Sequence, residues 1–336
     1  MTTLDQGSLS EQVLVTGGCG FLGKALVSQF LLRTTSRVRV LALPHEQIPG
    51  GWLNRLEVVR GDITRLDDVA RAAKDCGHIF HLAALVGDGG SYAEHERVTV
   101  GGTAHVFDVA EQEGATVVLT TSVCAYGDAL QRGLCPEETA LGRPQGPYGQ
   151  AKQGQEALAW RFRDQGGRVC VVRPANIIGP GSGPWLLDAA KALRQRLPAL
   201  VAGGQGNAAL AAVDNVADFL LLVARTPRSW GQAYNVHDGL EVSWRQYFLD
   251  LARLMGAPPP RAIPRWLAYL AAGVSEPVFR RYCPRMRPPV TREALNLVAW
   301  SNQFPIDKAR ALGWSPRVCY AQVMAQIGQD ILARGL

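Results

Sequence analysis

The chain lacks paired cysteines, a long apolar run and a charged secretory leader, and each absence excludes a class of protein. Its seven cysteines are scattered, with no Cys-x-x-Cys pair and no Cys/His cluster of zinc-binding spacing, so we expect reduced thiols and no bound metal. No apolar stretch approaches the length of a membrane-spanning helix, and the opening MTTLDQGSLSEQ does not resemble a secretory signal. These absences favour a folded cytoplasmic protein.

Charge is modest and is not arranged for nucleic acid. The formal net charge is +6, and the 47% hydrophobic and 19% charged residues are typical of a globular chain. Because no basic stripe is interleaved with aromatics, we expect no nucleic-acid partner. One local cluster holds Arg280, Arg281, Arg285 and Arg287. It is interpreted either as a solvated face or as a patch for anionic lipid or a phosphate-bearing substrate handle.

Short apolar runs alternate with segments of helical period between residues 12 and 173, as in repeated βα units. The pattern predicts an α/β fold, a Rossmann-type doubly wound parallel sheet with a smaller C-terminal α/β substrate lobe. We assign residues 11–175 and 211–236 to the cofactor domain, and residues 176–210 and 237–330 to the lobe. Strands are expected at residues 13–16, 38–42, 56–59, 79–82, 116–120 and 169–172, and helices after Gly20, near Leu66, near Ser91 and from Tyr148.

A glycine-rich turn follows the first expected strand, in the arrangement TGxxGxxG. Glycines at a strand-to-helix turn allow a tight bend and let the backbone approach a pyrophosphate at the helix N-terminus. The second strand runs into VLALPHE, where Pro44 and His45 stand at the usual place of the acid that binds ribose, so NAD or NADP is expected without preference. The candidate cofactor-binding residues are Gly17, Gly20, Phe21, Leu22, Gly23, His45, Asp62, Ile63, Leu82, Ala83, Ala84, Tyr148, Lys152, Pro174, Asn176 and Ile177.

The segment PYGQAK places Tyr148 and Lys152 four residues apart on one face of an expected helix. Ser122 lies just past the fifth strand, where it is either a substrate-binding hydroxyl or a turn hydroxyl that bonds local backbone. These three are the candidate catalytic residues. A phenol titrates near 10, so a neighbouring ammonium and a nicotinamide cation are expected to lower its pKa and let it move a proton.

With TGGCGFLG, HLAA, TTSVCAYG, YGQAK and RPANIIGPG in this order, the chain resembles the extended short-chain dehydrogenase/reductases, within the NAD-dependent epimerase/dehydratase superfamily. The resemblance implies an enzyme with a cofactor domain, a smaller substrate lobe and homodimers formed through helices near residues 92–113 and 148–165.

Two branches of this superfamily compete. Sugar dehydratases carry an Asp-Glu pair where Val123 and Cys124 stand here, and many sugar epimerases carry a diphosphate-binding arginine where Ala208 stands, although Asn176 matches an epimerase position. The C-terminal half resembles the 3β-hydroxysteroid dehydrogenase-like branch, which implies interconversion of a secondary alcohol and a ketone on a largely apolar small molecule. A 4-epimerase with internally recycled NAD, or a non-catalytic cofactor-binding protein, is the alternative.

Apolar side chains in the C-terminal half are expected to line the substrate pocket, or else to form ordinary core. They are Trp185, Leu186, Leu187, Trp266, Leu267, Tyr269 and Leu270. The stretch 264–274 is also a candidate for peripheral contact with a membrane surface.

Overall fold

A seven-stranded parallel sheet forms the centre of the structure, a computed structural model that describes residues 9–52, 54–283 and 287–336. The strand order is β10-β6-β5-β4-β1-β2-β3, so the crossover lies between β1 and β4. Apolar and β-branched residues such as those of TVVLT make these strands, as expected where both faces are covered. The strands are β1 (Gln12–Thr16), β2 (Arg37–Ala42), β3 (Glu57–Arg60), β4 (His78–His81), β5 (Thr116–Thr120), β6 (Val169–Pro174) and β10 (Ala233–Val236).

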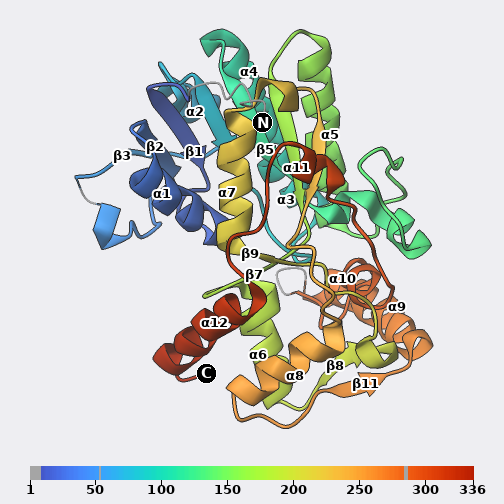
Figure 1. Cartoon of the computed structure of the whole chain (residues 1–336). Helices are drawn as coiled ribbons and strands as arrows, with labels where there is room; N and C mark the ends of the chain where they lie inside the picture. Colours follow the sequence, from blue (N-terminus) through green and yellow to red (C-terminus); the bar gives the residue numbers. More distant parts are fainter. Residues whose placement is uncertain (1–8, 53, 284–286) are drawn as a thin grey trace.

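Helices cover both faces of this sheet (Figure 1). On one face α1 and α7 pack against buried strand residues such as Val13 and Val15. On the other face α2, α4 and α5 pack against alternate residues such as Leu14 and Ile79. The helices are α1 (Phe21–Arg33), α2 (Leu66–Ala73), α3 (Tyr92–His95), α4 (Gly101–Glu113), α5 (Pro147–Asp164), α7 (Val213–Ala224) and α11 (Asp307–Ala311).

A smaller lobe lies beyond the carboxyl ends of the strands, in the lower half of Figure 1. Its own core is built around Trp244, Tyr247 and Leu251. The lobe contains two short parallel strand pairs, β7 (Asn176–Ile178) with β9 (Leu210–Ala212) and β8 (Pro198–Val201) with β11 (Arg261–Ile263). Its helices are α6 (Ala189–Arg194), α8 (Trp244–Leu254), α9 (Arg265–Tyr282), α10 (Arg292–Val298) and α12 (Tyr320–Arg334).

The expected α/β architecture is confirmed, and the six strands expected from the sequence are present within one or two residues. The expected helix starts are likewise found at α1, α2, α3 and α5. The chain returns to the sheet late, because β10 pairs with β6 and α7 packs beside α1. We retain the residue boundaries of the two domains as a proposal.

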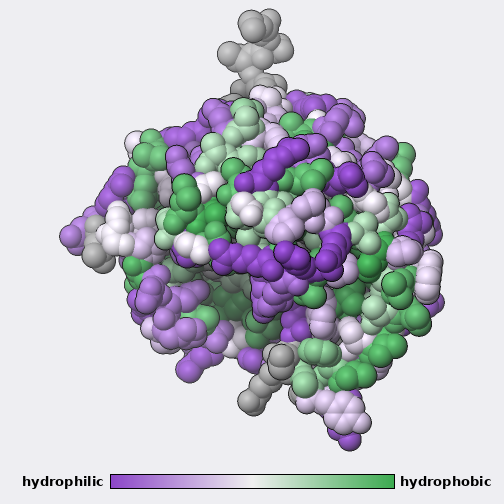
Figure 2. Space-filling model, turned by 90° about the horizontal axis from the view of Figure 1, so that it is seen from below, coloured by the Kyte–Doolittle hydropathy of each residue, from purple (hydrophilic) through white to green (hydrophobic). Residues whose placement is uncertain are grey.

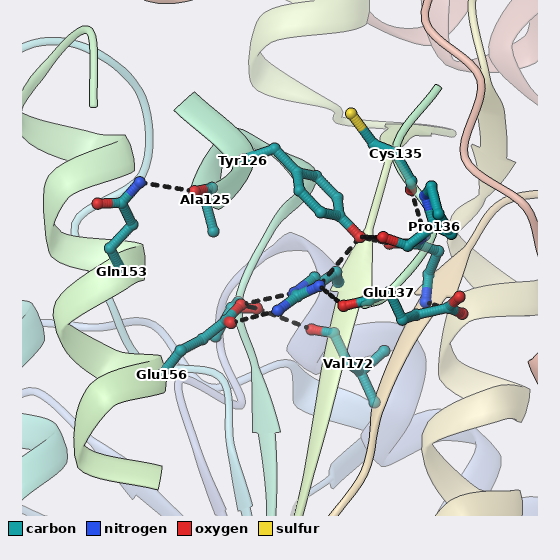
Figure 3. Close-up of polar contacts among 11 residues, drawn as sticks. Ala125, Tyr126, Cys135, Pro136, Glu137, Gln153, Glu156 and Val172 are labelled. Carbon is teal, nitrogen blue, oxygen red and sulfur yellow. Dashed lines mark hydrogen bonds and ion pairs between the residues drawn. The ribbon is translucent and has the colours of Figure 1, made fainter. Parts of the chain in front are cut away.

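A buried ion pair ties α5 to β6. The Arg173 guanidinium donates from Nη2 to Glu156 Oε2 at 2.6 Å and from Nε to Oε1 at 2.9 Å, and both side chains are almost fully buried. Arg173 Nη1 also donates to the Tyr126 hydroxyl, which donates to Asn235 Oδ1 on β10. Figure 3 shows Glu156 pointing from α5 toward Tyr126 and Glu137. The network therefore joins α5 to two strands and to the segment that follows β5.

Glu156→Ala should lower the free energy of unfolding by about 3–5 kcal/mol, since it leaves the buried Arg173 charge uncompensated. Urea unfolding followed by circular dichroism measures this change. Glu11→Ala is the matched control, because Glu11 also accepts from an arginine, Arg37, at 2.7 Å but both side chains are exposed. Equal effects of the two substitutions would contradict the structural role assigned to the buried pair.

Candidate active site

A cavity of about 610 Å³ lies between the carboxyl ends of the strands and the C-terminal lobe. In open parallel sheets this edge, next to the crossover, is where ligands bind. Every candidate site residue except His45 lines this cavity. The fold therefore gathers nearly all of the candidates at one cavity, although their individual roles stay predictions.

The glycine turn between β1 and α1 is packed too tightly for side chains. Gly17 has a φ of +68°, and a Cβ there would lie 2.7 Å from the backbone nitrogen of Ala83 at the end of β4. A Cβ at Gly23 would lie 2.1 Å from the carbonyl oxygen of Gly17. No side chain caps α1 at Gly20, so its N-terminal amides face the cavity as a site for an anion such as pyrophosphate.

Other groups around the cavity also fit a dinucleotide. Asp62 lines it after β3, and the buried Thr120 hydroxyl at the end of β5 has no hydrogen-bond partner among the described residues. His45 is exposed and lies away from the lining, whereas Glu46, one residue further on, contributes to it. Glu46 therefore supplies an acid in this loop, one residue after His45, where the sequence analysis predicted none.

Tyr148 and Lys152 lie on one face of α5, with Lys152 Nζ 5.4 Å from the centre of the Tyr148 ring. The ammonium donates to the carbonyl oxygen of Thr120 at 3.2 Å and to Gln155 Oε1 at 2.8 Å, which fixes its position. Ser122 stands at the end of β5 and accepts from the backbone nitrogen of Cys124 at 3.2 Å. Both sequence interpretations of Ser122 are thus compatible with its place, since it bonds local backbone and also lines the cavity.

Burial controls the ionisation of this pair. It lowers the pKa of Lys152 to about 8, and it raises the pKa of Tyr148 above its usual value. A hydrogen bond with Ser122 acts in the opposite direction on Tyr148 but is the smaller effect. The lowering expected for Tyr148 is therefore not produced by Lys152 alone. The prediction also relied on a nicotinamide cation, which would add positive charge beside the phenol.

Glu293, on α10 of the lobe, contacts the start of α5 and was not among the residues predicted from the sequence. Its Oε1 accepts from the backbone nitrogen of Gly149, where no side chain of the preceding segment caps α5. Its Oε2 is buried without a partner among the described residues, and the side chain lines the cavity. Burial, followed by the nearby Asp88 carboxylate, raises the pKa of Glu293 to about 8. No sequence signal marked it, because it lies 144 residues from its partner.

Arg281 and Arg287, the described side chains of the arginine cluster expected near the end of α9, lie in different surroundings. Arg287 forms ion pairs with Asp88 and Asp188, which brings the loop after β4 and the start of α6 together at the cavity edge. Arg281 is exposed, whereas Arg285 and the side chain of Arg280 lie outside what the structure describes. An anionic handle on the substrate therefore has no free cationic pocket at Arg287.

The expected apolar lining is partly wrong. Trp185 lines the cavity, but Leu186 belongs to the core of the lobe. Trp266, Leu267 and Leu270 point to solvent from α9. Other apolar side chains that line the cavity are Leu85, Val86, Val123, Leu297 and Val298.

Comparison with known proteins identifies the family. A family model described as "NAD dependent epimerase/dehydratase family" matches residues 13–236, which is more than half of the chain. The protein belongs to the NAD-dependent epimerase/dehydratase family. This confirms the resemblance drawn from the glycine turn and from the motifs around Ser122 and Tyr148.

Three relatives indicate the branch within this family. The chain is 28% identical to "2-alkyl-3-oxoalkanoate reductase" of Stenotrophomonas maltophilia, over 91% of this chain and 95% of that protein. It is also 28% identical to "4-hydroxy-2-methyl-3-oxo-4-farnesyl-3,4-dihydroquinoline-1-oxide ketoreductase" of Stigmatella aurantiaca, over 95% and 96%. Human "3 beta-hydroxysteroid dehydrogenase type 7" is 29% identical, over 77% and 78%. The 3β-hydroxysteroid dehydrogenase-like branch expected from the sequence is therefore confirmed.

Solved structures of this family share the fold. A dTDP-glucose 4,6-dehydratase double mutant from Streptomyces venezuelae, solved with NAD and DAU bound, superposes with a TM-score of 0.74 and 24% identity, covering 96% of this chain and 98% of that one. This similarity concerns the fold. The family match and the named reductases identify the protein as an NAD-dependent oxidoreductase of the extended short-chain type.

Glu293→Gln should change how stability depends on pH. The folded-state pKa of Glu293, about 8, is higher than the ordinary 4.5, so the wild type binds a proton on folding and loses stability as pH rises from about 4.5 to 8. The amide still accepts from Gly149 but does not titrate. The Tm of the variant minus that of the wild type should therefore increase over this range. A difference that is constant with pH would contradict the buried, protonated carboxyl.

Proposed function

We propose that the protein interconverts a secondary alcohol and a ketone on a largely apolar substrate, with NAD(P) as the redox partner. The observation that carries this proposal is the substrate side of the cavity, where Leu85, Val123, Trp185 and Leu297 are apolar. The relatives that reduce 3-oxo compounds, by their names, are consistent with this chemistry.

The described lining of this cavity has neither the acid pair of the dehydratases nor the arginine of the epimerases, although it includes Asn176. Val123 and Cys124 follow Ser122, so no carboxylate pair is present for dehydration. Ala208 is buried away from the lining, and Asn176 donates to the carbonyl oxygen of Ala208 at 2.7 Å. These features favour ketoreduction over epimerisation of a nucleotide sugar.

Three side chains move and hold the proton at the substrate oxygen. Nicotinamide, when bound, supplies or accepts the hydride. Tyr148 donates a proton to the carbonyl oxygen in reduction and takes it back in oxidation. Ser122 donates a hydrogen bond to the same oxygen as negative charge develops there. Lys152 holds a positive charge beside the phenol and so favours its ionised form.

Absorbance at 340 nm should change when the purified protein meets NAD(P)H and an apolar 3-oxo acid or ketone. Tyr148→Phe should lower turnover by about 10²-fold or more while cofactor binding is retained, since general acid–base catalysis has that magnitude. Tyr282→Phe is the control, because Tyr282 is an exposed tyrosine outside the cavity lining. If no net change occurs and a UDP-sugar is converted into its epimer, the epimerase alternative is correct.

We also propose that Glu46 favours NAD over NADP. Its carboxylate lines the cavity in the loop after β2, where an acid bonds ribose hydroxyls and repels a 2′-phosphate.

Glu46→Gln should lower the ratio of kcat/KM for NAD to that for NADP by roughly tenfold, because the repulsive charge is removed. Initial rates with both cofactors give the ratio. Glu57→Gln, at an exposed position on the neighbouring strand β3, is the control. An unchanged ratio in the Glu46 variant would refute this assignment.

Homodimerisation through α4 and α5 is a further proposal, supported by the family resemblance. These two helices lie side by side at the top of Figure 1, far from α9.

A further inference from the structure

Four polar side chains from four different elements are buried behind the cavity lining. Hydrophilic residues cover much of the surface that Figure 2 shows, as is usual for a folded protein. These four are instead at most 1% exposed, and none of them lines the cavity. They form a buried polar chain of Gln155 on α5, Thr103 on α4, His81 on β4 and Thr16 on β1. Burial of a polar group is unfavourable unless the group is hydrogen-bonded, so each of these side chains requires a partner.

The buried polar chain is a continuous series of hydrogen bonds that begins at Lys152. Lys152 Nζ donates to Gln155 Oε1 at 2.8 Å, and Gln155 Nε2 donates to Thr103 Oγ1 at 2.7 Å. Thr103 Oγ1 lies 2.8 Å from His81 Nε2, and His81 Nδ1 lies 2.7 Å from Thr16 Oγ1. Both ends of the Gln155 amide are therefore bonded inside the protein.

The direction of each bond follows from the hydroxyl of Thr103. Its single proton goes to the carbonyl oxygen of Thr99 at 2.6 Å, so the hydroxyl oxygen can only accept from Gln155 and His81. His81 therefore carries its proton on Nε2, and its Nδ1 accepts from Thr16. Burial, followed by the nearby ammonium, lowers the pKa of His81 to about 3, which keeps the ring neutral. The series of bonds thus begins at a charged group and continues through neutral ones.

The far end of the buried polar chain belongs to the turn predicted to hold the pyrophosphate. Thr16 is the last residue of β1 and directly precedes Gly17. Its Oγ1 accepts from the backbone nitrogen of Ala83, just after β4, at 3.3 Å. Gly17, Ala83 and Lys152 all line the cavity. The buried polar chain therefore connects the lysine to another wall of the same cavity.

Gln155 provides the shorter of the two bonds that the described residues offer to the Lys152 ammonium. The other, to the carbonyl oxygen of Thr120, measures 3.2 Å. An ammonium has three N–H donors, so one remains for the cavity. A hydrogen bond to the charged form of a group also favours that form, so the amide oxygen opposes the effect of burial on Lys152. Without this acceptor the side chain would keep one longer bond and be free to rotate.

We propose that Gln155 is a positioning residue for Lys152, and that the other three members of the buried polar chain brace it against the cofactor turn. Gln155 does not line the cavity, so it acts through the ammonium. In the reaction proposed above, it holds the positive charge where that charge favours ionised Tyr148. Its effect on turnover rests on the proposed function, whereas its hold on the ammonium does not.

Gln155→Met tests this assignment, because methionine is similar in size but lacks the amide. In alcohol oxidation kcat should fall roughly tenfold with little change in KM, and the pH of half-maximal kcat should rise by about one unit, since the phenol ionises less easily. NMR titration of the protein carrying ¹³C at the lysine Cε atoms measures Lys152 without substrate, and Lys152→Arg assigns its signal. The pKa of Lys152 should fall by about one unit in the Gln155 variant.

Gln153→Met is the matched control. Gln153 also lies on α5 and donates to two carbonyl oxygens, those of Ala125 and Gly142, each at 2.8 Å; Figure 3 shows the first of these bonds. Neither bond involves Lys152, so this variant should lower the Tm without moving the pH profile or the lysine titration. Thr103→Val removes the acceptor of the Gln155 amide. It should move both readouts in the same direction as Gln155→Met and by less.

The titratable groups around Tyr148 and Lys152 stay in place in these variants. They are Glu156 on α5, His81 on β4, Cys124 after β5 and Glu293 on α10. A shift of the pH profile is therefore due to the altered hold on the ammonium.

An unchanged Lys152 titration in Gln155→Met, or an equal shift in Gln153→Met, would overturn the assignment whether or not turnover is found. A lower kcat with an unmoved pH profile would also contradict it, because loss of packing alone has that effect. An unchanged titration in Thr103→Val would refute the bracing by the buried polar chain. If the titration shifts as expected but no alcohol or ketone is converted, the proposed function alone is refuted.

Discussion

The position of α5, which carries Tyr148 and Lys152, depends on the buried ion pair between Glu156 and Arg173. Tyr148, Lys152 and Glu156 are spaced four residues apart, so all three share one face of α5. A buried charge is tolerated only while it is paired, so α5 can neither rotate nor slide along β6 without a large penalty. The constraint that stabilises the core therefore also sets the distance of Tyr148 from the ends of β5 and β6, where the cavity begins.

The lobe completes the site as well as covering it. Glu293 reaches from α10 to the amide of Gly149, and Arg287 connects the loop after β4 to the start of α6 through two carboxylates. A carboxyl group near a helix N-terminus is stabilising even when burial keeps it protonated, because the backbone amides there need hydrogen-bond acceptors. The geometry of the phenol is thus set by groups from both halves of the chain.

The two faces of α9 differ in the size of their side chains. Its small inward residues let it lie close to α10, and so close to the cavity wall. Its outward residues are large, apolar and exposed to solvent. Where a sequence pattern shows only that a helix is amphipathic, the position of its neighbours decides which side is the interior, and here the large residues lie outside.

Local sequence determined the sheet, the glycine turn and the Tyr148–Lys152 pair, because strand periodicity, tight turns and a spacing of four along a helix are properties of a few adjacent residues. Fifteen of the sixteen candidate cofactor residues, all but His45, line one cavity, because strand ends of a parallel sheet meet at one edge, and their roles stay predictions. Tertiary structure alone decided the roles of Glu293 and Arg287, the outward orientation of Trp266 and the raised pKa of Tyr148. Each depends on contacts between segments far apart in the chain, and on burial, which no local pattern records.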